Sequence, residues 1–168
     1  MSDIKGNSTL NHDHCFVCGK NNPRGLGLNF HSDNGTTGCQ FDVPHGFESY
    51  SGITHGGLLA TLMDAAMARW LFDRGIIAFT GLMTVKFRDN VSPGEPLTLS
   101  AKKKNNRGRR YFMQATLKDR DGREVASAEA MFLQPKSEFN TQKSNIHSPI
   151  SNPSVTGVKR DENRNPNQ

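Results

Sequence analysis

Residues 52–72 read GITHGGLLATLMDAAMARWLF, and this stretch decides the fold. Across residues 58–72 the apolar side chains recur every three or four positions, which predicts a helix that is apolar over most of its surface. A helix of this kind has to be buried. Gly75 is the expected end of the helix, because glycine readily adopts the left-handed conformation of a helix C-terminus.

Four segments after the helix alternate apolar and polar residues, as strands with one buried face do. The apolar positions are Met83, Val85 and Phe87; Leu97, Leu99 and Ala101; Tyr111, Met113, Ala115 and Leu117; and Ala126, Ala128, Ala130 and Phe132. We expect an antiparallel meander whose small last-strand side chains leave room for the helix. Turns are expected at residues 92–94, at Asp121-Gly122 and at Asn105-Asn106. Before the helix, two weaker strands at residues 27–31 and 38–43 flank the turn dipeptide Asn34-Gly35.

Length and composition indicate one soluble domain. The chain has 168 residues, of which 34% are hydrophobic, and it lacks an apolar run of the roughly 20 residues that cross a bilayer. Three cysteines and an N-terminus without signal-peptide character favour a cytoplasmic protein. We expect a leader over residues 1–23, a folded domain over 24–135 and a disordered polar tail over 136–168.

The start of the helix and one acidic residue within it are the candidate site. His55-Gly56-Gly57 opens the helix, where unpaired backbone N–H groups and the helix dipole favour negative charge such as an oxyanion. Asp64 lies in mid-helix, where an unpartnered buried carboxylate is costly. The alternative for Asp64 is a solvent-facing stripe shared with Thr61, Ala68 and Arg69.

Helix geometry separates these two features. Asp64 follows His55 by nine positions, so they lie about 13 Å apart on opposite faces. One site can use both only if two chains place their helices side by side in opposite directions. The sequence therefore predicts a homodimer or a dimer of dimers.

These motifs together resemble the PaaI-like branch of the hotdog-fold thioesterases, in the 4-hydroxybenzoyl-CoA thioesterase superfamily. The resemblance covers about residues 15–133. It rests on His-Gly-Gly, on the aspartate nine positions later, on the strand and turn of residues 80–95, and on the leader CFVCGKNNPRGL at residues 15–26. It implies an α+β hotdog fold, in which an antiparallel sheet wraps around one long central helix.

The resemblance also implies an acyl-CoA thioesterase that hydrolyses small or medium acyl- or aryl-CoA to the free acid and CoA, without a metal or other cofactor. The N–H of Gly56 or Gly57 would polarise the thioester carbonyl, and His55 would orient it. Asp64 of the other chain would act as nucleophile or general base. Thr54 and Arg88 are further expected substrate contacts. The alternatives are a non-catalytic acyl-CoA-binding hotdog protein and, ranked last, a hydratase.

A basic run at residues 102–110 is the expected contact for the CoA phosphates, with Lys104 and Arg107 as its leading members. The alternative is a solvated loop with charged strand ends. Nucleic acid fits less well, because aromatic residues for base stacking are scarce near this run.

The leader carries Cys15 and Cys18 with the spacing of half a zinc knuckle, preceded by His12 and His14. A second cysteine pair is missing. A tetrahedral site would need both histidines, or Cys39 with His31, or the partner chain. A redox disulfide is another alternative. The favoured interpretation is a structural leader that packs its cysteines and Phe16 against the domain, with no metal.

Overall fold

The computed structural model of the chain describes residues 11–136. The expectations for residues 1–10 and for the tail from residue 137 onward lie outside this range. Within residues 11–136, no helix has the length and apolar character needed to cross a membrane. The described part of the chain forms a helix, a six-stranded sheet and a two-stranded hairpin.

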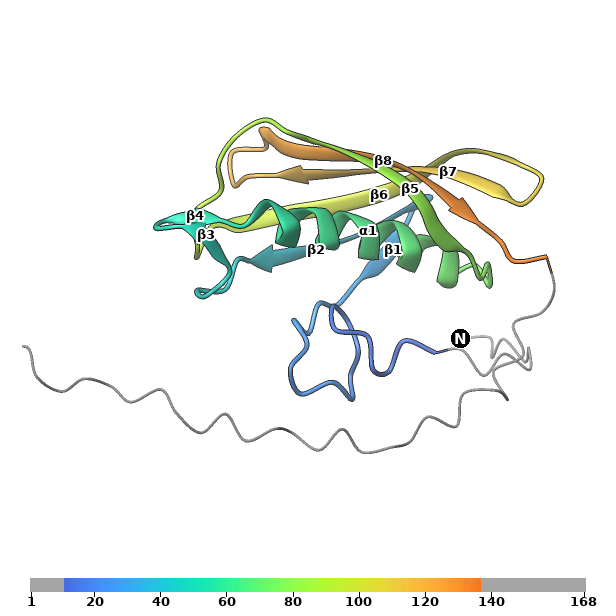
Figure 1. The fold of residues 1–168 in the computed structure, drawn as a ribbon, viewed down its shortest axis with the longest axis horizontal. Coiled ribbons are helices and arrows are strands. Elements are labelled where there is room, and N and C mark those ends of the chain that lie inside the picture. The colour runs from blue at the N-terminus through green and yellow to red at the C-terminus, as the bar shows by residue number, and fades with distance from the viewer. Residues whose placement is uncertain (1–10, 137–168) are drawn as a thin grey trace, which may run out of the picture.

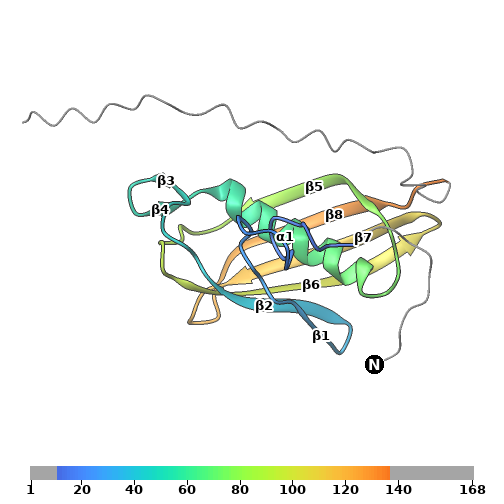
Figure 2. The ribbon, with the colours of Figure 1, turned by 90° about the horizontal axis from the view of Figure 1, so that it is seen from below.

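The main sheet is antiparallel throughout and has the order β1-β2-β6-β7-β8-β5. Its strands are β1 (His31–Asp33), β2 (Thr36–Asp42), β5 (Phe79–Phe87), β6 (Pro96–Arg107), β7 (Arg110–Lys118) and β8 (Glu124–Leu133). The small hairpin consists of β3 (Glu48–Tyr50) and β4 (Ile53–Thr54) and leads directly into helix α1 (Gly56–Phe72). Both views show α1 lying across one face of the main sheet (Figures 1 and 2).

The core lies between α1 and the sheet, as the sequence predicts. Eight side chains of α1 are buried: Leu58, Leu59, Leu62, Met63, Ala66, Met67, Trp70 and Leu71. The sheet meets them with the alternating residues of β6, β7 and β8, among which three alanines of β8 make space for the helix. This arrangement of one long helix on an antiparallel sheet confirms the predicted α+β hotdog fold.

Both ends of α1 are capped by identifiable residues. At the start, His55 is the N-cap, and its side chain accepts a hydrogen bond from the backbone. At the end, Gly75 has a φ of +69° and donates its N–H to the Phe72 carbonyl, while the N–H of Ile76 reaches the Leu71 carbonyl. This pair of bonds is a Schellman motif, and it confirms Gly75 as the terminating residue.

Two details of the predicted meander are wrong. β5 pairs with β8 at the far edge of the sheet rather than with β6, which follows it in the chain. Alternation shows that one face of a strand is buried and does not show which strands are neighbours. The β6–β7 turn also lies at Gly108, whose φ is +56°, because a bulge near Lys103 carries Asn105 and Asn106 into the strand.

The leader packs without regular structure against the side of α1 that faces away from the sheet (Figures 1 and 2). Residues 11–30 contain no helix or strand, so the predicted strand at residues 27–31 begins only at His31. Within residues 11–30, Val17 and Leu28 are buried in the core, and Cys15, Leu26 and Phe30 pack against it while partly buried. Phe16, which was expected to pack on the domain, is 54% exposed, and its neighbour Val17 takes that role.

Candidate active site

The start of α1 holds the His55 imidazole in one position. Its Nδ1 accepts a hydrogen bond of 2.8 Å from the Gly57 N–H, and its own backbone N–H donates to the Phe47 carbonyl at 2.7 Å. Because Nδ1 is an acceptor, a neutral His55 ring carries its hydrogen on Nε2. The Gly57 N–H is therefore already engaged, whereas the Gly56 N–H has no acceptor among the described residues.

A side chain at either glycine of this turn would press on a neighbouring ring. A Cβ on Gly57 would lie 2.9 Å from His55 Nδ1, and one on Gly56 would lie 3.3 Å from the ring of Phe87. Phe87 ends β5, and its ring thus borders the helix N-terminus. Sequence reasoning did not single out Phe87, because only the tertiary structure brings the end of β5 beside Gly56.

Thr54 immediately precedes this turn and is buried, with 4% of its surface exposed. Its backbone N–H donates to the Val91 carbonyl at 2.8 Å, which joins β4 to the loop before β6. The Thr54 hydroxyl has no hydrogen-bond partner in the described part of the chain. A buried hydroxyl without a partner loses its hydration without compensation.

Asp64 lies half-buried in mid-helix, and its Oδ1 accepts a hydrogen bond of 2.6 Å from the hydroxyl of Thr80. Thr80 stands near the start of β5. The carboxylate is thus held by a neighbouring strand, which a purely solvent-facing stripe does not require. Sequence reasoning missed Thr80, because a threonine in a strand carries no signal of the helix residue that it faces.

The helix keeps His55 and Asp64 apart within one chain. They are separated by two and a half turns of α1, which corresponds to about 13 Å along its axis. The structure therefore joins His55, Gly56 and Gly57 at one end of α1, and joins Asp64 with Thr80 farther along.

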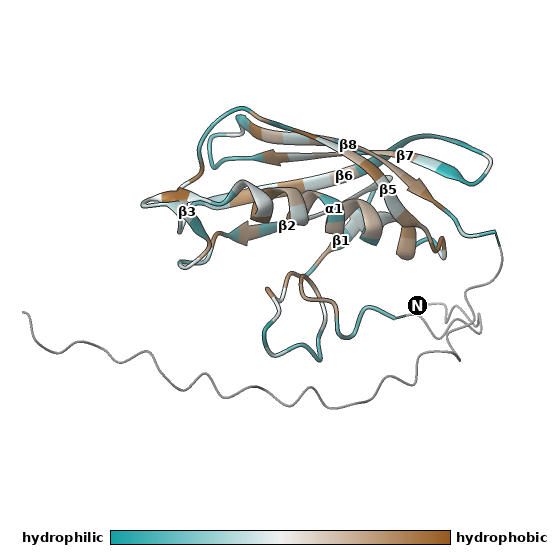
Figure 3. Ribbon diagram, viewed as in Figure 1, coloured by the Kyte–Doolittle hydropathy of each residue, from teal (hydrophilic) through white to brown (hydrophobic). Residues whose placement is uncertain are grey.

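The predicted basic contacts are distributed over the sheet. Arg88 donates to Glu124 at 2.7 Å, just beyond the end of β5, and Lys104 donates to Glu129 at 2.8 Å on the outer side. Arg107 is exposed at the end of the β6–β7 hairpin. Figure 3 shows hydrophilic residues at this hairpin end, which lies on the opposite side of the molecule from β3 and β4.

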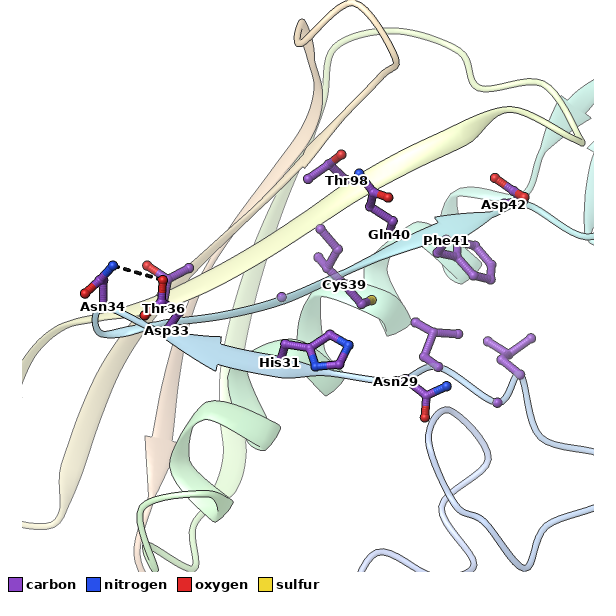
Figure 4. A pocket seen from close by; sticks show the side chains of 15 residues that line it. Asn29, His31, Asp33, Asn34, Thr36, Cys39, Gln40, Phe41, Asp42 and Thr98 are labelled. Carbon is purple, nitrogen blue, oxygen red and sulfur yellow. Dashed lines mark hydrogen bonds between the residues drawn. The ribbon is translucent and has the colours of Figure 1, made fainter. Parts of the chain in front are cut away.

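An open groove of about 890 Å³ runs along β1 and β2, where His31, Cys39 and Gln40 help to line it (Figure 4). It contains none of the residues predicted for the site. The groove is therefore separate from the start of α1 and from Asp64.

The Cys18 thiol of the leader does not have the lowered pKa of a reactive cysteine. Burial, followed by the proximity of Cys15, raises the pKa of the Cys18 thiol to about 11. Burial likewise raises the pKa of the Cys39 thiol to about 11. Redox-active cysteines depend on a lowered pKa, so the raised pKa of Cys18 weighs against the redox alternative. His12, Cys15 and Cys18 do lie together, with their ligating atoms within 4.8 Å of one another.

Comparison with known proteins gives a consistent result. Residues 51–126 match the sequence profile of the thioesterase superfamily. The mouse acyl-coenzyme A thioesterase THEM5 is 27% identical over 115 residues, which are 68% of this chain and 46% of that protein. The chain thus spans less than half the length of that relative.

Solved structures share the fold. The E. coli PaaI protein, from the phenylacetic acid degradation operon, has a TM-score of 0.61 at 22% identity, over 65% of this chain and 84% of that one. A thioesterase protein of Streptococcus pneumoniae, crystallised with coenzyme A, has a TM-score of 0.61 at 18% identity, over 64% and 85%. The pneumococcal protein has also been crystallised with alanine in place of an aspartate and, separately, of a threonine sixteen positions later.

Proposed function

We propose that this chain, a hotdog-fold protein whose residues 51–126 match the thioesterase superfamily, hydrolyses the thioester of a small or medium acyl- or aryl-CoA to the free acid and CoA. The distant match to a mouse acyl-CoA thioesterase supports this reaction, and the pneumococcal neighbour that holds coenzyme A supports the substrate class. The observation that carries the proposal is the hydrogen bond between Thr80 and Asp64.

Asp64 is the acid-base or nucleophilic group in this proposal. The Thr80 hydroxyl donates a hydrogen bond of 2.6 Å to Asp64 Oδ1 and thereby fixes the plane of the carboxylate. The other oxygen, Oδ2, is then left to deprotonate a water molecule or to attack the thioester carbon. Asp64 and Thr80 match, in residue type and in spacing, the two positions changed in the pneumococcal protein. That match supports a joint role, in which Thr80 is a positioning residue.

The start of α1 supplies the oxyanion site. The Gly57 N–H is bonded to His55 Nδ1, so the Gly56 N–H is the backbone donor that remains for the thioester oxygen. The same bond leaves the Nε2 hydrogen of His55 free to donate to that oxygen or to a neighbouring substrate group. Gly57 then acts indirectly, by holding the imidazole, and the absence of its Cβ makes this possible.

A complete site in this proposal takes His55 from one chain and Asp64 from the other, so the active form is a homodimer or a dimer of dimers. β5 supports this assembly, because it is an edge strand with exposed apolar side chains. Leu82 is 63% exposed and Phe87 is 53% exposed. An exposed apolar strand edge favours pairing with another strand.

The remaining predicted residues bind substrate in this proposal. Lys104 and Arg107 attract the CoA phosphates, and Arg88 extends the positive surface beyond β5. Lys104 and Arg88 already pair with exposed glutamates, so phosphate has to displace Glu129 and Glu124. Pairs this exposed are weak, which keeps both cations available. Thr54 contacts the substrate through a small movement of the turn, since its hydroxyl is covered in the described chain.

The test is release of CoA thiol from a panel of acyl- and aryl-CoA esters. The protein is expected to hydrolyse part of the panel, and Asp64→Asn is expected to lower kcat by about 100- to 10,000-fold, the usual contribution of a general base. Asp73→Asn is the matched control, because Asp73 follows the same helix and pairs only with groups outside the proposed site. Thermal stabilisation by CoA esters without thiol release would leave the binding-protein alternative instead.

A further inference from the structure

The leader brings three metal-ligating side chains together in the turn around residues 12–18. These are His12, Cys15 and Cys18, and each is half-buried. The distance from His12 Nδ1 to Cys18 Sγ is 3.7 Å. A tetrahedral zinc ion with Zn–S of about 2.3 Å and Zn–N of about 2.0 Å separates S and N ligands by about 3.5 Å. The two side chains are therefore already spaced for a shared zinc ion.

The backbone of the turn has the form of a metal knuckle. The Val17 N–H points at Cys15 Sγ with a distance of 3.4 Å, and the Gly19 N–H donates to the Cys15 carbonyl at 2.8 Å. An amide hydrogen directed at sulfur stabilises the thiolate that a metal requires. A Cβ on Gly19 would lie 2.4 Å from the Cys15 nitrogen, so this tight return is accessible to glycine and not to other residues.

The third ligand is oriented from outside the turn. The His12 ring packs against Phe72 at the end of α1, with ring centroids 4.4 Å apart. Ring packing leaves the edge with Nδ1 facing Cys18. A metal bound here would link the leader to the C-terminal end of α1, whereas the proposed oxyanion site lies at its N-terminal end.

Regular secondary structure does not order the segment that carries these ligands. Residues 11–30 have no helix or strand, and a structureless segment of this length inside a folded domain is uncommon. Val17 and Leu28 are its fully buried side chains, Cys15, Leu26 and Phe30 pack against the core while partly buried, and its backbone hydrogen bonds form mainly within the segment. A metal ion supplies folding free energy to segments of this kind.

We propose that His12, Cys15 and Cys18 bind one zinc ion that fastens the leader to the end of α1, with solvent in the fourth position. The donor set of two thiolates and an imidazole suits zinc. The proposal changes the expectation of a metal-free leader and is independent of the thioesterase reaction. A metal site also explains both the glycine at position 19 and the spacing of Cys15 and Cys18.

The test is metal analysis of the full-length protein, purified under reducing conditions with zinc supplied and then dialysed. We expect about one zinc per chain. Cobalt in place of zinc should give the absorption bands of a tetrahedral thiolate site. Cys15→Ser and Cys18→Ser are expected to lose the metal. His14→Ala and Cys39→Ser are the matched controls, and they should keep it, because His14 is exposed and Cys39 lies outside the cluster.

Three results would overturn the proposal. The first is zinc below one tenth of an equivalent in the unmodified protein, where full occupancy is the expectation. The second is equal loss of metal in His14→Ala or Cys39→Ser. The third is an unchanged melting temperature of the unmodified protein when a strong chelator removes its zinc. This last measurement needs no variant, so it decides the matter even where a cysteine variant fails to fold.

Discussion

Two inactive variants of this protein should restore activity when their subunits are combined. His55→Ala removes the group at the start of α1, and Asp64→Asn removes the carboxylate that Thr80 holds. Each variant alone leaves both sites of a dimer defective. The reason to expect rescue is the length of helix between the two residues, about 13 Å, which prevents them from serving one site within a chain.

The size of the rescue follows from two-fold symmetry. A mixed dimer contains one site with both defects and one site with none, because the intact His55 comes from one chain and the intact Asp64 from the other. Random association at equal amounts makes about half of all dimers mixed, so about one quarter of the wild-type activity should return. Mixed dimers isolated by two different affinity tags should show about half.

The assay is thiol release by the co-expressed pair, compared with each variant alone and with the Asp64→Asn and Asp64→Ala pair as the control. That control cannot assemble an intact site, so it should stay inactive. His55→Ala also removes a helix cap, worth about 1 kcal/mol, and its melting temperature must be measured to show that it folds. Mixed dimers without recovered activity would refute a site shared between chains.

Three further outcomes are expected. Thr80→Val should lower kcat by about 10- to 100-fold with little change in KM, because a hydrogen bond to a charged group contributes about 1.5–3 kcal/mol. Thr84→Val on the same strand is the control. Equal losses of kcat in both variants would contradict a positioning role for Thr80. Thr54→Val should raise the free energy of unfolding in a denaturant titration by about 1 kcal/mol, since it removes a buried hydroxyl without a partner, and a decrease would mean that the hydroxyl is bonded. Arg107→Ala should raise the KM for acyl-CoA and weaken its dependence on salt while kcat stays constant, which initial rates at several ionic strengths would test.

The helix and the strands were predictable because their signals are local. The apolar spacing of residues 58–72 and the alternation along β6, β7 and β8 each depend on a few neighbouring residues. The position of β5 was not predictable in this way. Its place beside β8 depends on pairing with residues 39 to 54 positions later in the chain, and its exposed Leu82 and Phe87 follow from that edge position.

The candidate site was predictable where its residues are adjacent in sequence. His55-Gly56-Gly57 predicted a helix start, and in the structure α1 begins at Gly56 with His55 as its N-cap. Thr80 and Phe87 were missed, because both reach the helix only through the folding of β5. For the leader, spacing alone left several ligand sets open. The packing of His12 on Phe72 is what brings that histidine, and not the exposed His14, to the cysteines.

In a single chain, the polar groups assigned to catalysis and binding are largely occupied by local partners. The Gly57 N–H is bonded to His55, Asp64 accepts from Thr80, and Lys104 pairs with Glu129. The first two contacts orient side chains that would otherwise rotate freely, so part of the entropic cost of building the proposed site is met before substrate arrives. A single chain cannot bring His55 and Asp64 together, because about 13 Å of helix separates them. Dimerisation is therefore the step that should create activity, and dilution below the dimer dissociation constant should abolish thiol release while the helix and sheet remain folded.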